Sequence, residues 1–193
     1  MFGSINEFAR DTGWLHSPIR GFANYGVVVF ALLLVAGWWL ARNRAARTMA
    51  AALWAGLATL LAVAANQPLV ARYHEARPYT DHPHILVLAT RSADYSFPSD
   101  HAVMAGAVAA GLWLVDRRLG VVATIAALLM AFCRVYIAAH YPHDVVAGLA
   151  FGAAFALVGW VLLARPLTWL VHRLSTTPLR PVLAGTDTTH GGS

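Results

Sequence analysis

Residues 119–139 read LGVVATIAALLMAFCRVYIAA, a largely apolar run with one charged residue, Arg134. The run falls within the roughly 17–25 residues that a helix needs to cross the hydrocarbon core of a bilayer. Four other runs share this length and character: 25–41, 48–65, 99–115 and 144–164. Together they predict an all-α integral membrane protein, built as a bundle of about five transmembrane helices.

The composition supports a membrane protein. Of the 193 residues, 59% are apolar and 12% are charged, and the mean hydropathy is +0.57. A soluble domain carries about 25% charged residues. The net charge is +5 and all 14 basic residues are arginine, but they lie between the apolar runs rather than on one soluble face. We therefore expect no nucleic-acid partner.

The runs divide the chain into three predicted parts. Within the first part, Phe2, Ile5 and Phe8 recur at helical spacing, which predicts one or two amphipathic helices lying on the membrane interface. A loosely ordered arm is the alternative. From Thr176 the chain is rich in threonine, proline and glycine, and we expect disorder towards its end. The predicted parts are an interfacial segment at 1–23, a transmembrane domain at 24–165 and a cytoplasmic tail at 166–193.

Arginine placement predicts the orientation. The loops at 42–47 and 116–118 carry arginines, and Arg165 and Arg173 follow the last run. The positive-inside rule places all of these on the cytoplasmic side. With five spans, the long loop at 66–98 then lies on the outer face.

The sequence Pro98-Ser99-Asp100-His101 precedes an apolar run and opens a predicted helix. Either Ser99 or Asp100 is suited to cap that helix. The free N–H groups and the positive end of the helix dipole then form a site for an anion such as phosphate. An ordinary capped helix without a ligand is the alternative.

A second motif, Arg134-x5-His140-x3-Asp144, joins two predicted helices at an outer corner. Asp144 is close enough in sequence to accept a hydrogen bond from one ring nitrogen of His140. That bond fixes the tautomer and leaves the other nitrogen as a nucleophile. The alternative is a structural ion pair between Arg134 and Asp144, with His140 as an interfacial residue.

Arg77 precedes Pro78 in the long outer loop. Its guanidinium is a planar fork that binds phosphate through two hydrogen bonds, although a solvated arginine is the alternative. Arg77 and the two motifs all fall on one predicted face. They contain a nucleophile, its orienting acid, a second histidine and cationic groups, which are the parts of a phosphoryl-transfer site.

These segments resemble the three signature motifs of the type 2 phosphatidic acid phosphatase family, over about residues 66–164. The family commonly has glycine where this chain has Asp100. The resulting Pro-Ser-Asp-His form resembles the bacterial undecaprenyl-diphosphatase branch associated with bacitracin resistance. The resemblance implies a multi-pass protein of the bacterial plasma membrane with its site on the outer face.

The resemblance also implies a mechanism without metal or cofactor. His140 would attack phosphorus to form a phosphohistidine that water hydrolyses, with Asp144 supporting His140 and His101 acting as general acid. The implied substrate-binding residues are Arg77, Pro98, Ser99, Asp100 and Arg134.

Two positions depart from the family's motifs. Val70 stands where a lysine usually begins the first motif, and Arg72 and His74 are candidates for the missing charge. Cys133 replaces a serine before Arg134. His82 and His84 suggest a metal site only superficially, because they lack cysteine partners or helical spacing, so we expect a solvated loop.

The implied substrate is a polyprenyl diphosphate such as undecaprenyl diphosphate, cleaved to the monophosphate and inorganic phosphate, with its tail between the helices. The expected partners are therefore the lipid phosphate and the surrounding membrane lipids, while the oligomeric state stays open. Alternatives are a phosphatidic acid or phosphatidylglycerophosphate phosphatase, a non-catalytic lipid-phosphate binding or transport protein, and a histidine-ligated haem or metal carrier.

Overall fold

The computed structural model describes residues 1–178 and 180–183, and every regular element within them is a helix. The expected all-α fold is therefore confirmed, whereas most of the expected disordered tail lies outside the described residues. The elements are α1 (Phe2–Asp11), a 3₁₀ turn η1 (Gly13–Leu15), α2 (His16–Tyr25), α3 (Val27–Ala41), α4 (Ala46–Tyr73), α5 (Pro78–Asp81), α6 (Asp100–Trp113), α7 (Arg117–Tyr136), α8 (Pro142–Leu174) and α9 (Arg180–Leu183).

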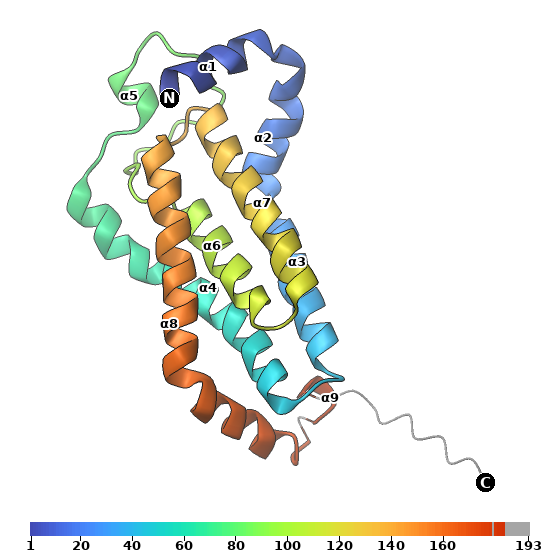
Figure 1. Ribbon diagram of the computed structural model, residues 1–193. Coiled ribbons are helices and arrows are strands. Elements are labelled where there is room, and N and C mark those ends of the chain that lie inside the picture. The colour runs from blue at the N-terminus through green and yellow to red at the C-terminus, as the bar shows by residue number, and fades with distance from the viewer. Residues whose placement is uncertain (179, 184–193) are drawn as a thin grey trace.

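Helix α6 forms the centre of the bundle and packs against α3, α4, α7 and α8 (Figure 1). It contacts α8 most closely because glycines remove side chains from the crossing. A Cβ atom added to Gly152 would lie 2.0 Å from the carbonyl oxygen of Val103, and one added to Gly106 would lie 2.3 Å from that of Leu149. Small residues allow helix backbones in membranes to approach in this way. The crossing fixes the start of α8 beside the start of α6.

Three helical segments of the described chain are long and apolar enough to cross a membrane: Ala46–Asp81, Arg117–Tyr136 and Pro142–Leu174. The bent pair Gly13–Tyr25 and Val27–Ala41, with 53° between its halves, makes a fourth if it counts as one span. Helix α6 has 14 residues, too few for it to count among these segments by its own length, and it packs against α3, α4, α7 and α8. The chain is thus a helical membrane protein.

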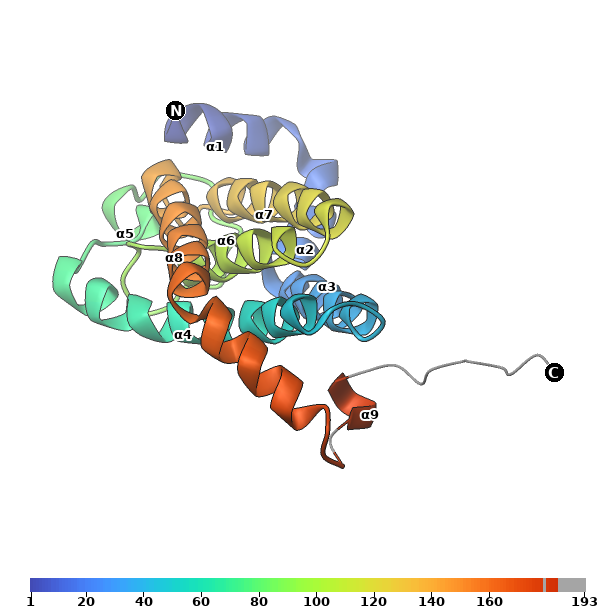
Figure 2. The same ribbon diagram turned by 60° about the horizontal axis from the view of Figure 1, so that its bottom comes forward.

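Two helices run further than the hydropathy runs predicted. Helix α4 ends at Tyr73 rather than at residue 65, and α8 ends at Leu174, beyond the expected domain boundary at 165. Each contains an internal proline, Pro68 or Pro166, which removes a backbone donor and favours a bend rather than a stop. The late bend of α8 is visible in Figure 2. The extension of α4 is important because it reaches the candidate site.

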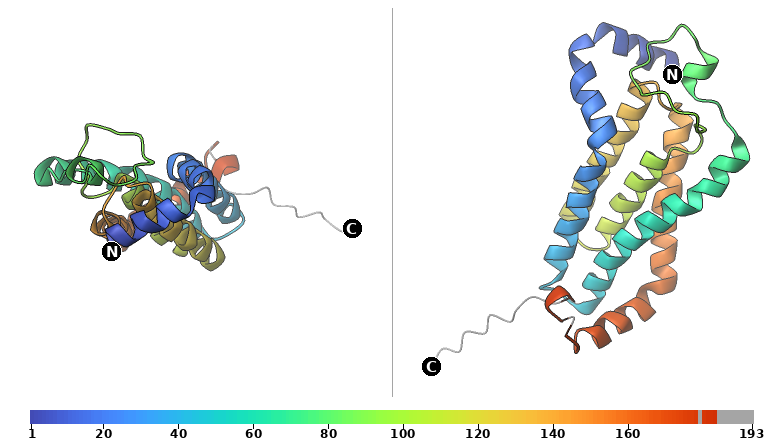
Figure 3. Two further views of the ribbon diagram at one scale, coloured as in Figure 1. Left: turned by 90° about the horizontal axis from the view of Figure 1, so that it is seen from above. Right: turned by 180° about the vertical axis from the view of Figure 1, so that it is seen from behind.

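The N-terminal helices cover one end of the bundle. Helix α1 lies across that end when the molecule is seen from above (Figure 3, left). The side chain of Asn6 exchanges two hydrogen bonds with the backbone of Leu86, at 2.7 and 3.0 Å. The hydroxyl groups of Thr12 and Tyr136 lie 2.8 Å apart, which connects the following turn to α7. The N-terminal segment is therefore helical, and hydrogen bonds connect it to the long loop and to α7.

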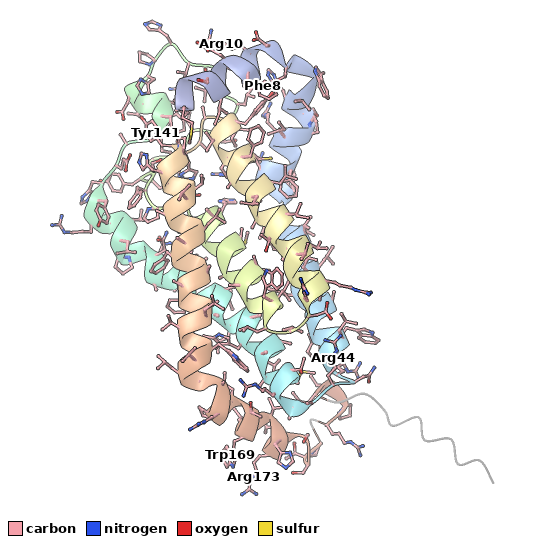
Figure 4. The ribbon with its side chains drawn as sticks, in the orientation of Figure 1. Phe8, Arg10, Arg44, Tyr141, Trp169 and Arg173 are labelled. Carbon is pink, nitrogen blue, oxygen red and sulfur yellow. The ribbon has the colours of Figure 1, made fainter. Side chains whose placement is uncertain are left out.

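The two ends of the bundle differ in their residues. Figure 4 shows Tyr141 and Arg10 at one end and Arg44 and Arg173 at the other. At the second end, Arg44 forms an ion pair with Asp116 at 2.9 Å and so connects the loop before α4 to the loop before α7. The arginine-rich loops at 42–47 and 116–118 therefore meet at the end of the bundle opposite Tyr141.

Candidate active site

His140 lies in the tight turn between α7 and α8. Ala138 adopts a left-handed conformation in this turn, with φ of 61°, and Pro142 occupies the first turn of α8. Proline suits this position because the first helical residues need no N–H donor. His140 is held between two rigid helices and is only 3% exposed.

The hydrogen bonds of His140 define its tautomer. Its Nδ1 atom lies 2.9 Å from the carbonyl oxygen of Ser96. A carbonyl oxygen only accepts hydrogen bonds, so Nδ1 carries the proton and the neutral ring has its lone pair on Nε2. Both Nη1 of Arg77 and Nη2 of Arg134 lie 3.3 Å from that Nε2 atom. The basic nitrogen of His140 thus faces two guanidinium groups.

Burial lowers the pKa of His140 below its ordinary value of 6.5, and the positive charges of Arg134 and Arg77 lower it further. Contact with Asp144 opposes this change without outweighing it. The protonated form is thus disfavoured, and the imidazole is neutral at pH 7. This charge state agrees with an Nε2 atom that accepts hydrogen bonds.

Asp144 supports His140 through Ser96. Its Oδ2 atom accepts a short hydrogen bond from the Ser96 hydroxyl and another from the backbone N–H of Tyr141 at 2.8 Å. The same oxygen is 3.5 Å from Nδ1 of His140, whose proton points to the Ser96 carbonyl instead. The sequence suggested a direct bond between Asp144 and His140, and it did not predict that Ser96 would contact either residue. The one sequence feature that pointed to Ser96 was its position two residues before the Pro98-Ser99-Asp100-His101 motif.

A chain of polar groups continues from Asp144 to the surface. His143 Nε2 lies 2.7 Å from Glu75 Oε1 and 3.0 Å from Asp144 Oδ1. The ligand atoms of these three residues lie within 4.8 Å of one another, which is close enough to hold a cation. Within the described residues, this is the group of acidic and histidine side chains with that spacing. Asp144 is therefore coupled to an exposed histidine on one side and to Ser96 on the other.

Arg77 is oriented by backbone and side-chain acceptors. Its guanidinium donates to the carbonyl oxygen of Asp94 at 3.1 Å, to the carboxylate of Asp94 at 2.9 Å and to the carbonyl oxygen of Ala139 at 3.0 Å. Partial burial raises the pKa of Asp94, but the Ser92 hydroxyl and the Arg77 charge outweigh that effect, so the pKa is lowered. Asp94 is thus a charged partner of Arg77 that the sequence motifs did not indicate.

Arg134 keeps unused donor capacity. Its Nη1 atom makes a long contact of 3.5 Å to the carbonyl oxygen of Ala23, and its buried Nε atom has no hydrogen-bond partner among the described residues. A buried guanidinium N–H without an acceptor is costly. An anion bound next to His140 would supply the missing acceptor.

The start of α6 is held against α4. The Nδ2 atom of Asn66 donates to the carboxylate of Asp100 at 2.7 Å and to the carbonyl oxygen of Pro98 at 3.1 Å, and Gln67 also donates to Asp100, at 3.0 Å. Ser99 is the N-cap residue, but its side chain caps no N–H group. Its buried hydroxyl has no partner within residues 1–178 and 180–183. Asn66 and Gln67 therefore fix the turn that presents Ser99.

A cavity of about 200 Å³, called here the polar cavity, brings most of the expected residues together. Ser99 and Asp144 are buried and do not line it. Val70 and Gln67 of α4 line it, whereas Arg72 and His74 do not, so neither replaces the lysine of the family's motif there. Six expected site residues line the polar cavity: Arg77, Pro98, Asp100, His101, Arg134 and His140.

A second hollow of about 440 Å³ lies between α3, α4 and α6 and is called here the apolar groove. Its walls are almost entirely apolar and include Phe30, Val63 and Met104. Asp100 and His101 line both the polar cavity and the apolar groove. The two spaces are therefore neighbours on either side of these residues.

The arrangement suits an anion with the size and charge of a phosphate group. Arg77 and Arg134 supply charged donors, which form stronger hydrogen bonds than neutral ones. The Nε2 atom of His140 lies 3.3 Å from a nitrogen of each guanidinium and has a lone pair available, and His101 is a second histidine in the same cavity. A nucleophile, charged donors and a proton donor are the groups that phosphoryl transfer requires.

Comparisons with known proteins agree with this chemistry. A sequence profile described as "PAP2 superfamily" matches residues 51–167. Undecaprenyl-diphosphatase BcrC of Bacillus subtilis is 30% identical over 176 residues, covering 90% of this chain and 89% of that protein. Bacitracin transport permease protein BcrC of Bacillus licheniformis is 26% identical over 173 residues, covering 90% and 83%. Lipid A 1-phosphatase of Rhizobium johnstonii is 37% identical over 109 residues, covering 56% and 43%. No solved structure matches the chain significantly.

Proposed function

Because the chain belongs to the PAP2 superfamily, we propose that it is a lipid phosphatase that hydrolyses a polyprenyl diphosphate to the monophosphate and inorganic phosphate. Undecaprenyl diphosphate is the favoured substrate, since a relative that matches most of the chain is an undecaprenyl-diphosphatase. The observation that carries the proposal is the neutral Nε2 atom of His140, 3.3 Å from both Arg77 and Arg134.

In the first step, His140 Nε2 attacks the terminal phosphorus of the diphosphate. A nitrogen–phosphorus bond forms, the bond from that phosphorus to the bridging oxygen breaks, and His101 gives its proton to the leaving lipid phosphate. Arg77 and Arg134 bind the oxygens of the phosphoryl group, where fixed cationic donors stabilise the charge of the transition state. Asp144 and Ser96 hold the proton of His140 on Nδ1 and stabilise the ring when it becomes positive.

In the second step, water attacks the phosphohistidine. His101, now without its proton, accepts one from the water, the nitrogen–phosphorus bond breaks, and inorganic phosphate leaves. Pro98 and Asp100 form part of the wall of the polar cavity. The buried hydroxyl of Ser99, which has no partner among the described residues, would donate to a phosphate oxygen that reaches past this wall. No step uses a metal ion or a cofactor.

The expected membrane arrangement remains part of the proposal. Five spans at 25–41, 48–65, 99–115, 119–139 and 144–164 would place the arginine-rich loops in the cytoplasm and the polar cavity at the outer face of a bacterial plasma membrane. Residues 1–23 would lie on the outer interface, 24–165 would form the phosphatase domain, and 166–193 would form a cytoplasmic tail.

A different lipid phosphate is the second candidate substrate. One relative, matching about half of the chain, is named a lipid A 1-phosphatase, so the superfamily's motifs occur with other phosphorylated lipids. Phosphatidic acid and phosphatidylglycerophosphate are the corresponding glycerolipids. A non-catalytic lipid-phosphate binding or transport protein would keep the cationic cavity but would not need a nucleophile oriented by Ser96.

A phosphate-release panel tests the function. The purified protein in detergent micelles, with a chelator present, is expected to release phosphate from undecaprenyl diphosphate faster than from phosphatidic acid, phosphatidylglycerophosphate or a lipid A 1-phosphate. Micelles without protein give the background. Preference for a glycerolipid would reassign the substrate, no release from any lipid would favour a binding protein, and activity that depends on added divalent ions would contradict the metal-free mechanism.

A further inference from the structure

We propose that the apolar groove between α3, α4 and α6 binds the first isoprene units of the substrate's chain and sets the preference for a single polyprenyl tail. The proposal rests on the function proposed above and adds the place of the lipid. It follows from the shape of the groove, from its continuity with the polar cavity and from the proton donor at their junction.

The groove is built from one face of α3. Val27, Phe30, Ala31 and Leu34 line it, and their spacing of three and four residues is that of a single helical face. Phe30 is buried in its floor, whereas Val27 is 45% exposed at its rim. The groove therefore has a closed floor and an edge that is open towards lipid.

Helices α4 and α6 form the other walls. On α4, Thr59 is buried while Leu60 is 72% exposed at the rim. On α6 the lining extends from Asp100 to Val108, which corresponds to about 12 Å along the helix axis at 1.5 Å per residue. An elongated apolar space leading away from a charged cavity matches a chain attached to a phosphate group. Its volume of about 440 Å³ lies within the roughly 300–1,000 Å³ usual for ligand sites.

The junction of the polar cavity and the apolar groove, at His101, indicates where the leaving group lies. His101 lines both spaces, and its proposed proton goes to the oxygen that separates from the attacked phosphorus. In a diphosphate, that oxygen belongs to the phosphate carrying the lipid chain. If the attacked phosphorus lies beside His140 and the leaving oxygen beside His101, the chain continues directly into the groove.

A second apolar hollow offers no such continuity. It lies between α6, α7 and α8 and includes Trp113, Leu128 and Leu157, and it shares no residue with the polar cavity. Of these two apolar hollows, the groove is thus the one connected to the polar cavity. One groove accommodates one chain, so a polyprenyl diphosphate fits more completely than a glycerolipid with two acyl chains.

Ala31 and Leu32 provide a matched test, because both are exposed on α3 and only Ala31 lines the groove. We expect Ala31→Phe to obstruct the groove. The ratio of kcat/KM for undecaprenyl diphosphate to kcat/KM for dimethylallyl diphosphate is expected to fall by at least about tenfold, because burial of part of a long apolar chain is lost. Leu32→Phe is expected to leave this ratio unchanged. An equal ratio in the two variants would overturn the proposal.

A binding measurement separates this proposal from the proposed reaction. Cys133 is buried and is the sole cysteine in the sequence, so a cysteine introduced by Ala31→Cys is the accessible thiol. In phosphatidylcholine-containing micelles, undecaprenyl phosphate is expected to slow alkylation of Ala31→Cys at least about tenfold, but not that of Leu32→Cys. Protection at both positions, or at neither, would show that the groove holds only bulk lipid, whether or not the protein hydrolyses diphosphates.

Discussion

Replacing His140 with alanine is expected to lower phosphate release from undecaprenyl diphosphate by at least about a thousandfold, as loss of a nucleophile does in other enzymes with covalent intermediates. His140 is the residue whose Nε2 atom faces both Arg77 and Arg134. Neither guanidinium replaces it, because a guanidinium group offers only hydrogen-bond donors and no nucleophilic lone pair. Steady-state phosphate release from the purified variant gives the measurement.

The control for this variant is His82→Ala, since His82 is an exposed histidine outside the polar cavity. Its activity is expected to stay within about twofold of the unmodified protein. Circular dichroism and size-exclusion chromatography in detergent check that His140→Ala folds, because the substitution also removes the bond to the Ser96 carbonyl. A folded His140→Ala protein with near-normal turnover would rule out His140 as the nucleophile.

The second large effect is expected at Arg134. The substitution Arg134→Lys keeps one positive charge but removes the planar fork, so the Nε and Nη2 donors no longer reach a phosphoryl oxygen together. We expect kcat/KM for undecaprenyl diphosphate to fall by about a hundredfold, the scale for loss of one preorganised transition-state donor. Steady-state kinetics over a substrate series, which separates kcat from KM, gives the measurement.

Arg117→Lys is the matched control, because Arg117 is an exposed arginine at the other end of the same helix. It should change kcat/KM by less than about twofold. Equal effects of the two substitutions would mean that Arg134 acts through general charge or helix packing. Arg134 would then bind no phosphoryl oxygen.

Hydropathy was sufficient to predict the all-helical fold and the approximate position of each bundle helix. The run at 119–139 corresponds to α7 (Arg117–Tyr136), because an apolar segment of that length has few alternatives in a membrane. The run at 48–65 underestimated α4, since Asn66 and Gln67 are polar and Pro68 is a usual helix breaker. In the structure these residues remain helical and face the start of α6, where Asp100 accepts bonds from both amides.

Most of the residues that the motifs singled out share one cavity in the structure, but the motifs did not indicate all of their hydrogen-bond partners. The spacing of Arg134, His140 and Asp144 anticipated one corner of the molecule, because a tight turn between helices limits where the side chains can go. Ser96 lies between Asp144 and His140 because its hydroxyl bonds to Asp144, a residue 48 positions away in the sequence. No local pattern contains such information. The same holds for the pairing of Arg77 with Asp94.

The apolar groove also lay beyond sequence analysis. Gly26 separates α2 from α3, and a Cβ atom there would lie 2.5 Å from the carbonyl oxygen of Phe22 and 2.7 Å from Cε of Met130. A larger residue is thus excluded at the break where the chain bends by 53°. The bend sets the course of α3 along the groove. Within an apolar run, one glycine gives no indication of its direction.

The most direct test of the proposed mechanism is to identify the phosphorylated atom. The protein is mixed with undecaprenyl diphosphate labelled in its terminal phosphate, quenched in denaturant at alkaline pH, and digested for mass spectrometry and ³¹P NMR. The mechanism predicts acid-labile label on His140, attached to Nε2, because Nδ1 is occupied by the Ser96 carbonyl. Label on Nδ1 of His140, label on His101, or turnover without any phosphorylated protein would contradict it.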